Sequence, residues 1–216
     1  MREKAAVLTK KFTNLINPTM FLSDKDIKSA VESGAITLDP FNIKQLQPAT
    51  YDIRLGNTFI VNESHTASVI DIERDIFPKT KTIEVADGEP FVLHPGVSIL
   101  GYSKEKFGSD EFLIEVNGKS SLARIGLIVH NSASIVNPGH ILQIALELCN
   151  LNNVPIILRP DMLIAQLTFS TLSSHTKRSY KTVGRYHLNN IVGYVPPKTG
   201  PLAKRKGKSV TKAKRK

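Results

Sequence analysis

Short apolar segments divided by turn residues fill the sequence from residue 36 to residue 170. The segments are rich in Val, Ile, Leu and Phe, and pairs such as Asp87-Gly88 and Pro138-Gly139 separate them. So many short strands, with no room for helices between them, predict an all-β sandwich or barrel and exclude alternating βα units. No internal repeat is found.

Ten segments are predicted to be strands. They are 51–55, 58–61, 82–85, 91–93, 97–103, 112–116, 125–129, 144–148, 155–158 and 163–170. One short helix is expected before them, over residues 24–32. Ser23 can cap its first turn, Asp24 and Asp26 suit the positive end of the helix dipole, and Gly34 follows its end.

The charge of +10 divides the chain into three parts. Residues 204–216 hold eight of the 29 Lys and Arg, so the other 21 nearly balance the 19 Asp and Glu. We therefore expect an N-terminal extension (1–19), one β domain (20–195) and a disordered basic tail (196–216). The tail is either a polyanion or nuclear-import contact or a solvated solubilising segment.

Several classes of protein are disfavoured by composition. No apolar run approaches the roughly 18 residues of a membrane helix, and the first twenty residues lack a secretory apolar block, so we expect a soluble, cytoplasmic chain, or a nuclear one if the tail directs import. A single cysteine, Cys149, allows no internal disulfide. With no HxxxH or HxH pair, a zinc centre is disfavoured.

Three segments carry residues that a β core does not require. The segment 118–124 (GKSSLAR) combines a glycine turn with Lys, two hydroxyls and Arg, which suits an oligophosphate; the alternative is an exposed turn. The segment 131–139 can bring backbone close to a ligand, or form an ordinary hairpin. Glu147 alternates with buried positions of a strand, so it is either a solvated residue or a partly buried carboxylate with a raised pKa.

Five sequence blocks resemble the dCTP deaminase family. They are LSDKDI at 22–27, QPATYDIRLG at 47–56, GKSSLARIGL at 118–127 with Val129-His130, Pro138-Gly139 with Leu146-Glu147, and PDMLIAQLTF at 160–169. The resemblance implies the fold shared with trimeric dUTPases, a distorted β-barrel of mixed strands. It also implies a homotrimer with active sites between subunits, hydrolysis of dCTP to dUTP and ammonia, and Mg²⁺ carried on the triphosphate.

The resemblance also implies residue roles. Glu147 is the general base and acid, Ser120 and the carbonyl of Ala133 hold the attacking water, and Arg124 offsets developing charge. The resemblance implies that eight residues bind the phosphates or the sugar of the nucleotide. They are Lys119, Ser120, Ser121, Arg124, Asn137, Tyr180, Arg185 and Asn189. No zinc is required, since the HxE and PCxxC motifs of zinc deaminases are absent.

The sequence departs from the family at several of these positions. Asn137 stands where Asp is usual, and an amide cannot act as a base, although it can bind a sugar hydroxyl. Ile135 replaces the Arg of single-activity bacterial deaminases, and Leu142 replaces a glycine. Two alternatives therefore stay open: a dUTPase or bifunctional enzyme that releases diphosphate, and a nonenzymatic nucleotide-binding or regulatory trimer. Besides dCTP, dUTP and dTTP are nucleotides that the protein could bind.

Overall fold

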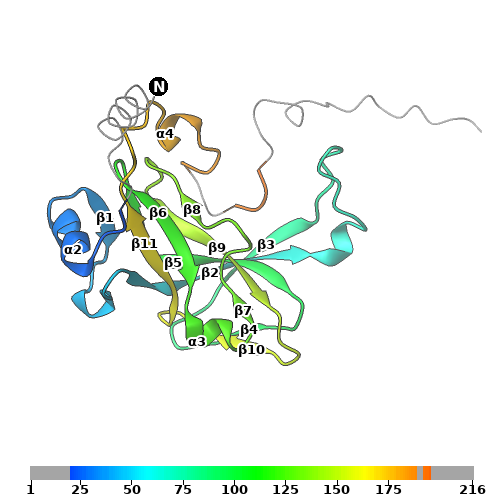
Figure 1. Ribbon diagram of the computed structural model, residues 1–216. Coiled ribbons are helices and arrows are strands. Elements are labelled where there is room, and N and C mark those ends of the chain that lie inside the picture. Colours follow the sequence, from blue (N-terminus) through cyan, green and yellow to red (C-terminus); the bar gives the residue numbers. More distant parts are fainter. Residues whose placement is uncertain (1–19, 189–191, 196–216) are drawn as a thin grey trace, which may run out of the picture.

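Nine strands form one curled sheet in the computed structural model, which describes residues 20–188 and 192–195 (Figure 1). Its strands are β1 (Ile36–Asp39), β2 (Tyr51–Glu63), β3 (Lys79–Glu84), β5 (Ser98–Ser109), β6 (Leu113–Gly118), β7 (Leu127–Ile128), β8 (Ile135–Val136), β9 (Leu142–Asn150) and β11 (Leu163–Ser170). The order across the sheet is β7-β9-β5-β2-β11-β6-β8, with β1 beside β5 and β3 beside β2. β4 (Phe91–Leu93) and β10 (Ile156–Leu158) make a separate pair. The predicted mainly β fold is confirmed.

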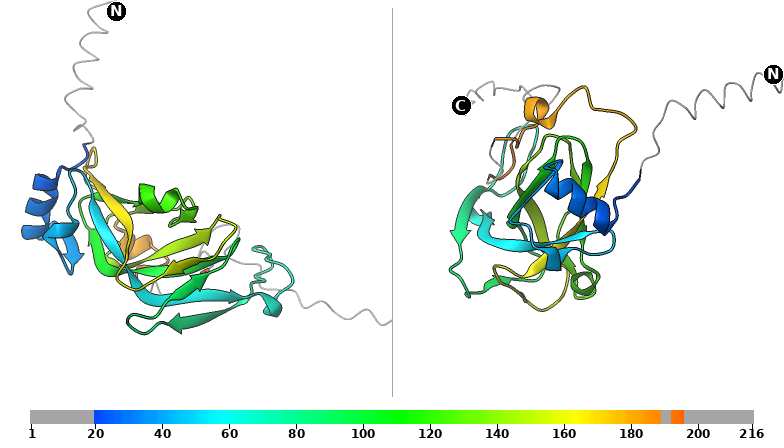
Figure 2. Two further views of the ribbon diagram at one scale, coloured as in Figure 1. Left: turned by 90° about the horizontal axis from the view of Figure 1, so that it is seen from below. Right: turned by 90° about the vertical axis from the view of Figure 1, so that its left-hand side faces the viewer.

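All strand pairs in the described part of the chain are antiparallel. The mixed strand directions that the resemblance implied are not found there. The sheet curls around a core of apolar side chains, among which Phe59, Phe107 and Phe169 have no exposed surface (Figure 2).

Helices are few and short. α2 (Asp24–Glu32) has the predicted bounds, the hydroxyl of Ser23 accepts the Asp26 N–H at 3.4 Å, and Gly34 follows with φ +79°. α2 buries Ile27 in the core. The others are α3 (Ser120–Ala123), α4 (Tyr180–Val183) and the 3₁₀ turns η1 (Ile43–Gln45) and η2 (Ser64–Thr66). No helix in the described ranges is both long and apolar enough to span a membrane.

The strands differ from prediction where turn residues lie inside a strand. The predicted strands 51–55 and 58–61 are one strand, β2, whose pairing with β5 shifts in register between Leu55 and Phe59. Gly56 makes this continuation possible, since a Cβ there would lie 3.1 Å from the Tyr102 carbonyl oxygen. β8 was not predicted, because small polar residues surround its two members.

α3 and α4 lie at opposite ends of the curled sheet, as Figure 1 and the right-hand view of Figure 2 both show. α3 follows β6, and α4 follows the long segment after β11. The two helices carry different groups of predicted site residues. The predicted extension 1–19 and tail 196–216 lie outside the described residues, so the division into three parts stays a prediction.

Candidate functional site

A pocket of about 410 Å³ lies between β9, the connection from β8 to β9, and the C-terminal segment. Four predicted site residues line it: Ala133, Asn137, Glu147 and Tyr180. These residues come from parts of the chain up to 47 positions apart. The structure therefore gathers four of the ten predicted site residues in one place.

Glu147 reaches this pocket because β9 alternates its side chains between two faces. Leu146 and Leu148 have no exposed surface and belong to the core, while Glu147 is half-buried on the other face. Its Oε2 accepts a hydrogen bond from the Asn131 N–H at 3.3 Å. The predicted facing of this strand is confirmed.

Burial raises the pKa of the Glu147 carboxyl. The backbone N–H of Asn131, the backbone N–H of Glu147 itself and the charge of His130 oppose this shift without cancelling it. Such a carboxyl can accept and return a proton nearer neutral pH than an exposed one. His130 received no role from the sequence. Its Nδ1 is buried without a hydrogen-bond partner among the described residues.

The loop 118–124 follows the C-terminal end of β6, and none of its residues lines the pocket. Ser120, Ser121 and Arg124 are exposed. The carbonyl of Lys119 accepts the N–H groups of Leu122 and Ala123 at 3.0 and 2.9 Å, which closes α3. The structure thus presents three of the predicted phosphate-binding side chains to solvent, outside the pocket that contains Glu147.

Lys119 does not share that exposure. Its Nζ lies 2.6 Å from Oδ1 of Asp52 on β2, and the two side chains are only 21% and 6% exposed. The pair crosses β11, which separates β6 from β2 in the sheet. The ammonium of Lys119 is therefore neutralised from inside the protein, and its predicted phosphate contact requires that this ion pair open.

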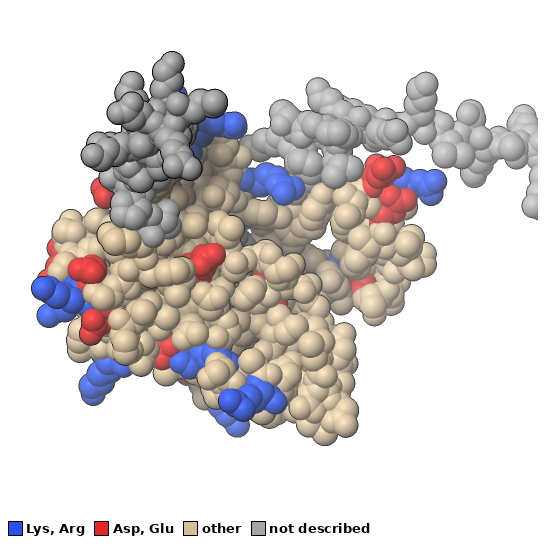
Figure 3. Space-filling view, in the orientation of Figure 1, with Lys and Arg blue, Asp and Glu red and all other residues tan. Residues whose placement is uncertain are grey.

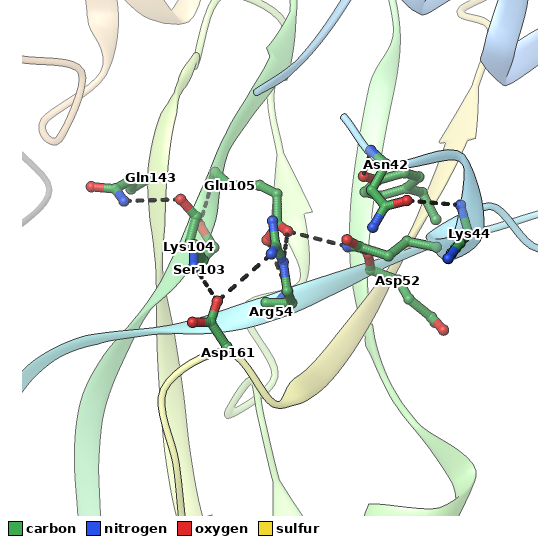
Figure 4. A network of polar contacts seen from close by, with 11 residues as sticks. Asn42, Lys44, Asp52, Arg54, Ser103, Lys104, Glu105, Gln143 and Asp161 are labelled. Atoms are coloured by element: carbon green, nitrogen blue, oxygen red, sulfur yellow. Dashed lines mark hydrogen bonds and ion pairs between the residues drawn. The ribbon is translucent and has the colours of Figure 1, made fainter. Parts of the chain in front are cut away.

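A buried polar network adjoins this pair (Figure 4). Glu105 on β5 has no exposed surface, and its carboxylate accepts hydrogen bonds from Arg54 Nε at 2.7 Å, Arg54 N at 2.8 Å and Gln45 Nε2 at 3.1 Å. Asp161 lies 3.7 Å from Arg54 Nη1 and pairs with Lys104. The network joins β2 to β5 and the turn before β11, so it supports the fold rather than the pocket.

The remaining residues singled out by the sequence lie in different places, and only one of them lines the pocket. Arg185 donates from Nη1 to the carbonyl of Val195 at 2.9 Å and is not among the residues that line the pocket. Asn189 lies outside the described residues. Ile135 lines the pocket and is 56% exposed, whereas Leu142 packs against the core and not against the pocket.

No group of three or more His, Cys, Asp or Glu side chains that could hold a metal ion occurs within residues 20–188 and 192–195. Cys149 is a free, half-buried thiol on β9.

The fold and the pocket define a class of protein. It has a curled antiparallel sheet, a pocket with a half-buried carboxylate, and an exposed loop with Ser and Arg outside that pocket. The chain belongs to the dCTP deaminase-like family, whose model matches residues 21–172. A Tropheryma whipplei (strain Twist) protein named "dCTP deaminase, dUMP-forming" is 44% identical over 162 residues, or 74% of this chain and 83% of that protein. A Dictyoglomus thermophilum protein of the same name is 41% identical over 174 residues, or 78% and 90%.

A solved structure shares the fold. The crystal structure of 2′-deoxycytidine 5′-triphosphate deaminase from Agrobacterium tumefaciens superposes with a TM-score of 0.54 at 21% identity. The match covers 72% of this chain and spans half of that protein's chain. At this identity the likeness concerns the fold alone.

Proposed function

We propose that this protein is an enzyme that hydrolyses the C4 amino group of dCTP, giving dUTP and ammonia. The observation that carries the proposal is the half-buried Glu147 carboxyl, with its raised pKa, in the pocket that also contains Ala133 and Asn137. Membership of the dCTP deaminase-like family and the names of relatives at 40–44% identity support the substrate.

Glu147 serves as base and then acid. Its carboxylate takes a proton from water as the water oxygen attacks C4 of the pyrimidine, and it passes that proton to N3. Collapse of the tetrahedral carbon breaks the bond to nitrogen, and a second proton, from the new hydroxyl, leaves with ammonia. Burial in the pocket supports this role because a raised pKa matches the group to both transfers.

The other catalytic groups come from a neighbouring copy of the chain. Ser120 and Arg124 are exposed on the loop at α3 and are not among the residues that line the pocket. A closed ring brings the loop of one copy to the pocket of the next, which is how a homotrimer would complete each site. Ser120 and the Ala133 carbonyl then hold the water, and Arg124 offsets charge in the transition state.

The triphosphate is bound by side chains from both copies. Ser121 joins Ser120 and Arg124 on the loop, and Lys119 joins them when the triphosphate displaces Asp52. From the pocket side, Asn137 binds the sugar and Tyr180 belongs to the segment that closes over the nucleotide, with Arg185 and Asn189 after it. Mg²⁺ enters as part of the substrate, bound to the triphosphate.

A second candidate reaction adds release of diphosphate, so that dUMP is the final product. The names of the relatives favour it, since each contains "dUMP-forming". Asn137 opposes it, because a neutral amide cannot take a proton from a water that attacks phosphorus. We therefore propose dUTP as the final product, and analysis of the reaction products distinguishes it from dUMP.

Product analysis tests the proposal. The purified protein is incubated with Mg²⁺ and either dCTP or dUTP, and nucleotides, ammonia and diphosphate are separated and quantified. Glu147→Gln is compared with Glu84→Gln, which makes the same change at an exposed position of β3. We expect dUTP and ammonia from dCTP, intact dUTP, and at least a hundredfold loss only in Glu147→Gln. Diphosphate would establish the second candidate, and nucleotide binding without turnover would establish the nonenzymatic alternative.

A further inference from the structure

Residues 179–188 pack on the connection between β8 and β9, beside the pocket. The Tyr180 N–H donates to the Pro138 carbonyl at 2.9 Å. Gly139, with φ +90°, lies so close to the segment that a Cβ there would come within 2.0 Å of Ser179 Oγ. Tyr180 itself lines the pocket. The position of this segment therefore controls one wall of the site.

His140 makes the aromatic part of this contact. Its ring stacks on Tyr180 with centroids 4.4 Å apart and planes inclined by 16°. The residue is 8% exposed and its Nε2 is buried. His187, from the docked segment, also has a buried Nε2, and neither atom has a hydrogen-bond partner within the described ranges. The β8–β9 connection and the docked segment thus each place one imidazole in the contact, and each imidazole has a buried nitrogen with no hydrogen-bond partner among the described residues.

We propose that His140 is a positioning residue that holds residues 179–188 over the pocket while its imidazole is neutral and releases them when it is protonated. A second proton on the His140 ring would be buried without an acceptor, which costs far more than burying the neutral ring. Undocking exposes both rings to water and removes that cost. Acid therefore opens the wall of the pocket that Tyr180 forms.

The electrostatics of the contact agree with this geometry. Burial, and after it the charge of His187, lowers the pKa of His140 to about 4. Once undocked, the ring returns to the ordinary histidine value near 6.5. Because the docked state has the lower pKa, docking is complete above pH ~6.5 and weakens up to tenfold per pH unit as the pH falls towards about 4.

Other titratable groups surround the contact. They are Tyr180 and Lys181 on α4, Tyr186 and His187 after it, Asp110 beyond β5, and Glu147 on β9. Lys181 pairs with Asp110 at 2.8 Å, but both side chains are more than half exposed, so this pair contributes little to docking. Of these groups, His187 is the one whose charge acts on His140.

Hydrogen exchange of the full-length protein without nucleotide tests the proposal. One amide reports docking: the Tyr180 N–H, bound to the Pro138 carbonyl at 2.9 Å. After correction for intrinsic exchange, the protection of the Tyr180 N–H in the wild type should fall roughly fivefold between about pH 6.5 and 5.5. His140→Phe keeps a ring for the stack but cannot be protonated, so its protection should stay constant. His65→Phe, at an exposed turn, is the matched control and should behave like the wild type.

Constant protection in the wild type, or an equal fall in His140→Phe, would overturn the proposal. If His140→Phe does not fold, the ring protons of His140 are followed by NMR in the wild type. Their titration must then coincide with the change at the Tyr180 amide, and independent titrations would also overturn it.

The expected effect of His140 on catalysis rests on the proposed function, whereas its effect on the docking of residues 179–188 does not. With dCTP as substrate, the wild type should show a KM that rises in acid, and His140→Phe should not. If no deamination occurs at any pH, the exchange measurement still decides the role of His140. Failure of one proposal is thus distinguishable from failure of the other.

Discussion

Glu105 shows how much a single buried charge depends on its partner. Its carboxylate has no exposed surface and is bound by the side chain of Arg54 at 2.7 Å. Arg54→Met leaves that charge buried without its cation, and we expect a loss of about 3–5 kcal/mol in the free energy of unfolding. The double variant Arg54→Met/Glu105→Met should recover most of this loss, because no uncompensated charge remains.

Urea unfolding monitored by tyrosine fluorescence or circular dichroism measures both variants. Arg74→Met is the control, since Arg74 also pairs with a carboxylate, Asp71 at 3.4 Å, but is 80% exposed. It should change the free energy of unfolding by no more than about 0.5 kcal/mol. A loss below about 1 kcal/mol in Arg54→Met would contradict the argument.

Glu147 is expected to lower the stability of the folded protein above mildly acidic pH. Because burial raises its folded pKa, the ionised form is less favourable folded than unfolded, so its contribution to folding becomes unfavourable as the pH rises from about 4.5 through the folded pKa. Glu147→Gln should therefore have a higher Tm than the wild type at pH 8. The difference should vanish near pH 4, where both side chains are neutral. An equal or lower Tm for Glu147→Gln at pH 8 is the contrary result, and Glu84→Gln again serves as control.

At the scale of elements, Gly139 decides whether the C-terminal segment docks. Gly139→Ala adds a Cβ at φ +90° that meets Ser179 Oγ at 2.0 Å and Tyr180 N at 3.0 Å. We expect residues 179–188 to lose their exchange protection at every pH, while the sheet keeps its own. Gly88→Ala is the matched control, because φ is +84° there and a Cβ meets nothing within 4 Å. It should cost about 1–2 kcal/mol in stability and leave the segment docked, whereas equal protection in both variants would refute the role of Gly139.

Local signals predict the elements better than they predict how the site is divided. The cap at Ser23 and the glycine after α2 suffice for that helix, and alternation along β9 suffices to place Glu147 on the face away from the core. The pairing of Lys119 with Asp52 depends instead on β6, β11 and β2 being neighbours, which no short segment encodes. For the same reason the sequence grouped residues of α3 with Glu147, although within one chain the α3 residues do not line the pocket that contains Glu147.

The whole molecule adds a basic tail to a body of mixed charge. Acidic and basic side chains are interspersed on the face shown in Figure 3, while residues 204–216, outside the described ranges, hold eight Lys and Arg and no acid. Three tails on one trimer would multiply any weak affinity for a polyanion. We expect retention on duplex DNA that falls steeply with salt and is lost on deletion of 203–216. Unchanged retention by the shortened protein would show that residues before 203 bind the DNA.

Assembly is the last property that the division of the site predicts. If Glu147 of one copy acts with Arg124 of another, then Glu147→Gln and Arg124→Ala proteins are each inactive, but mixed trimers contain some intact sites. Random assembly from equal amounts gives a neighbouring pair with both wild-type halves about one time in four, so unfolding and refolding the mixture should restore roughly a quarter of wild-type dCTP turnover. Mixing Glu147→Gln with Glu147→Ala should restore none. An inactive mixture of the first kind, from trimers shown to contain both variants, would place Glu147 and Arg124 in one chain's site and contradict the separation of α3 from the pocket.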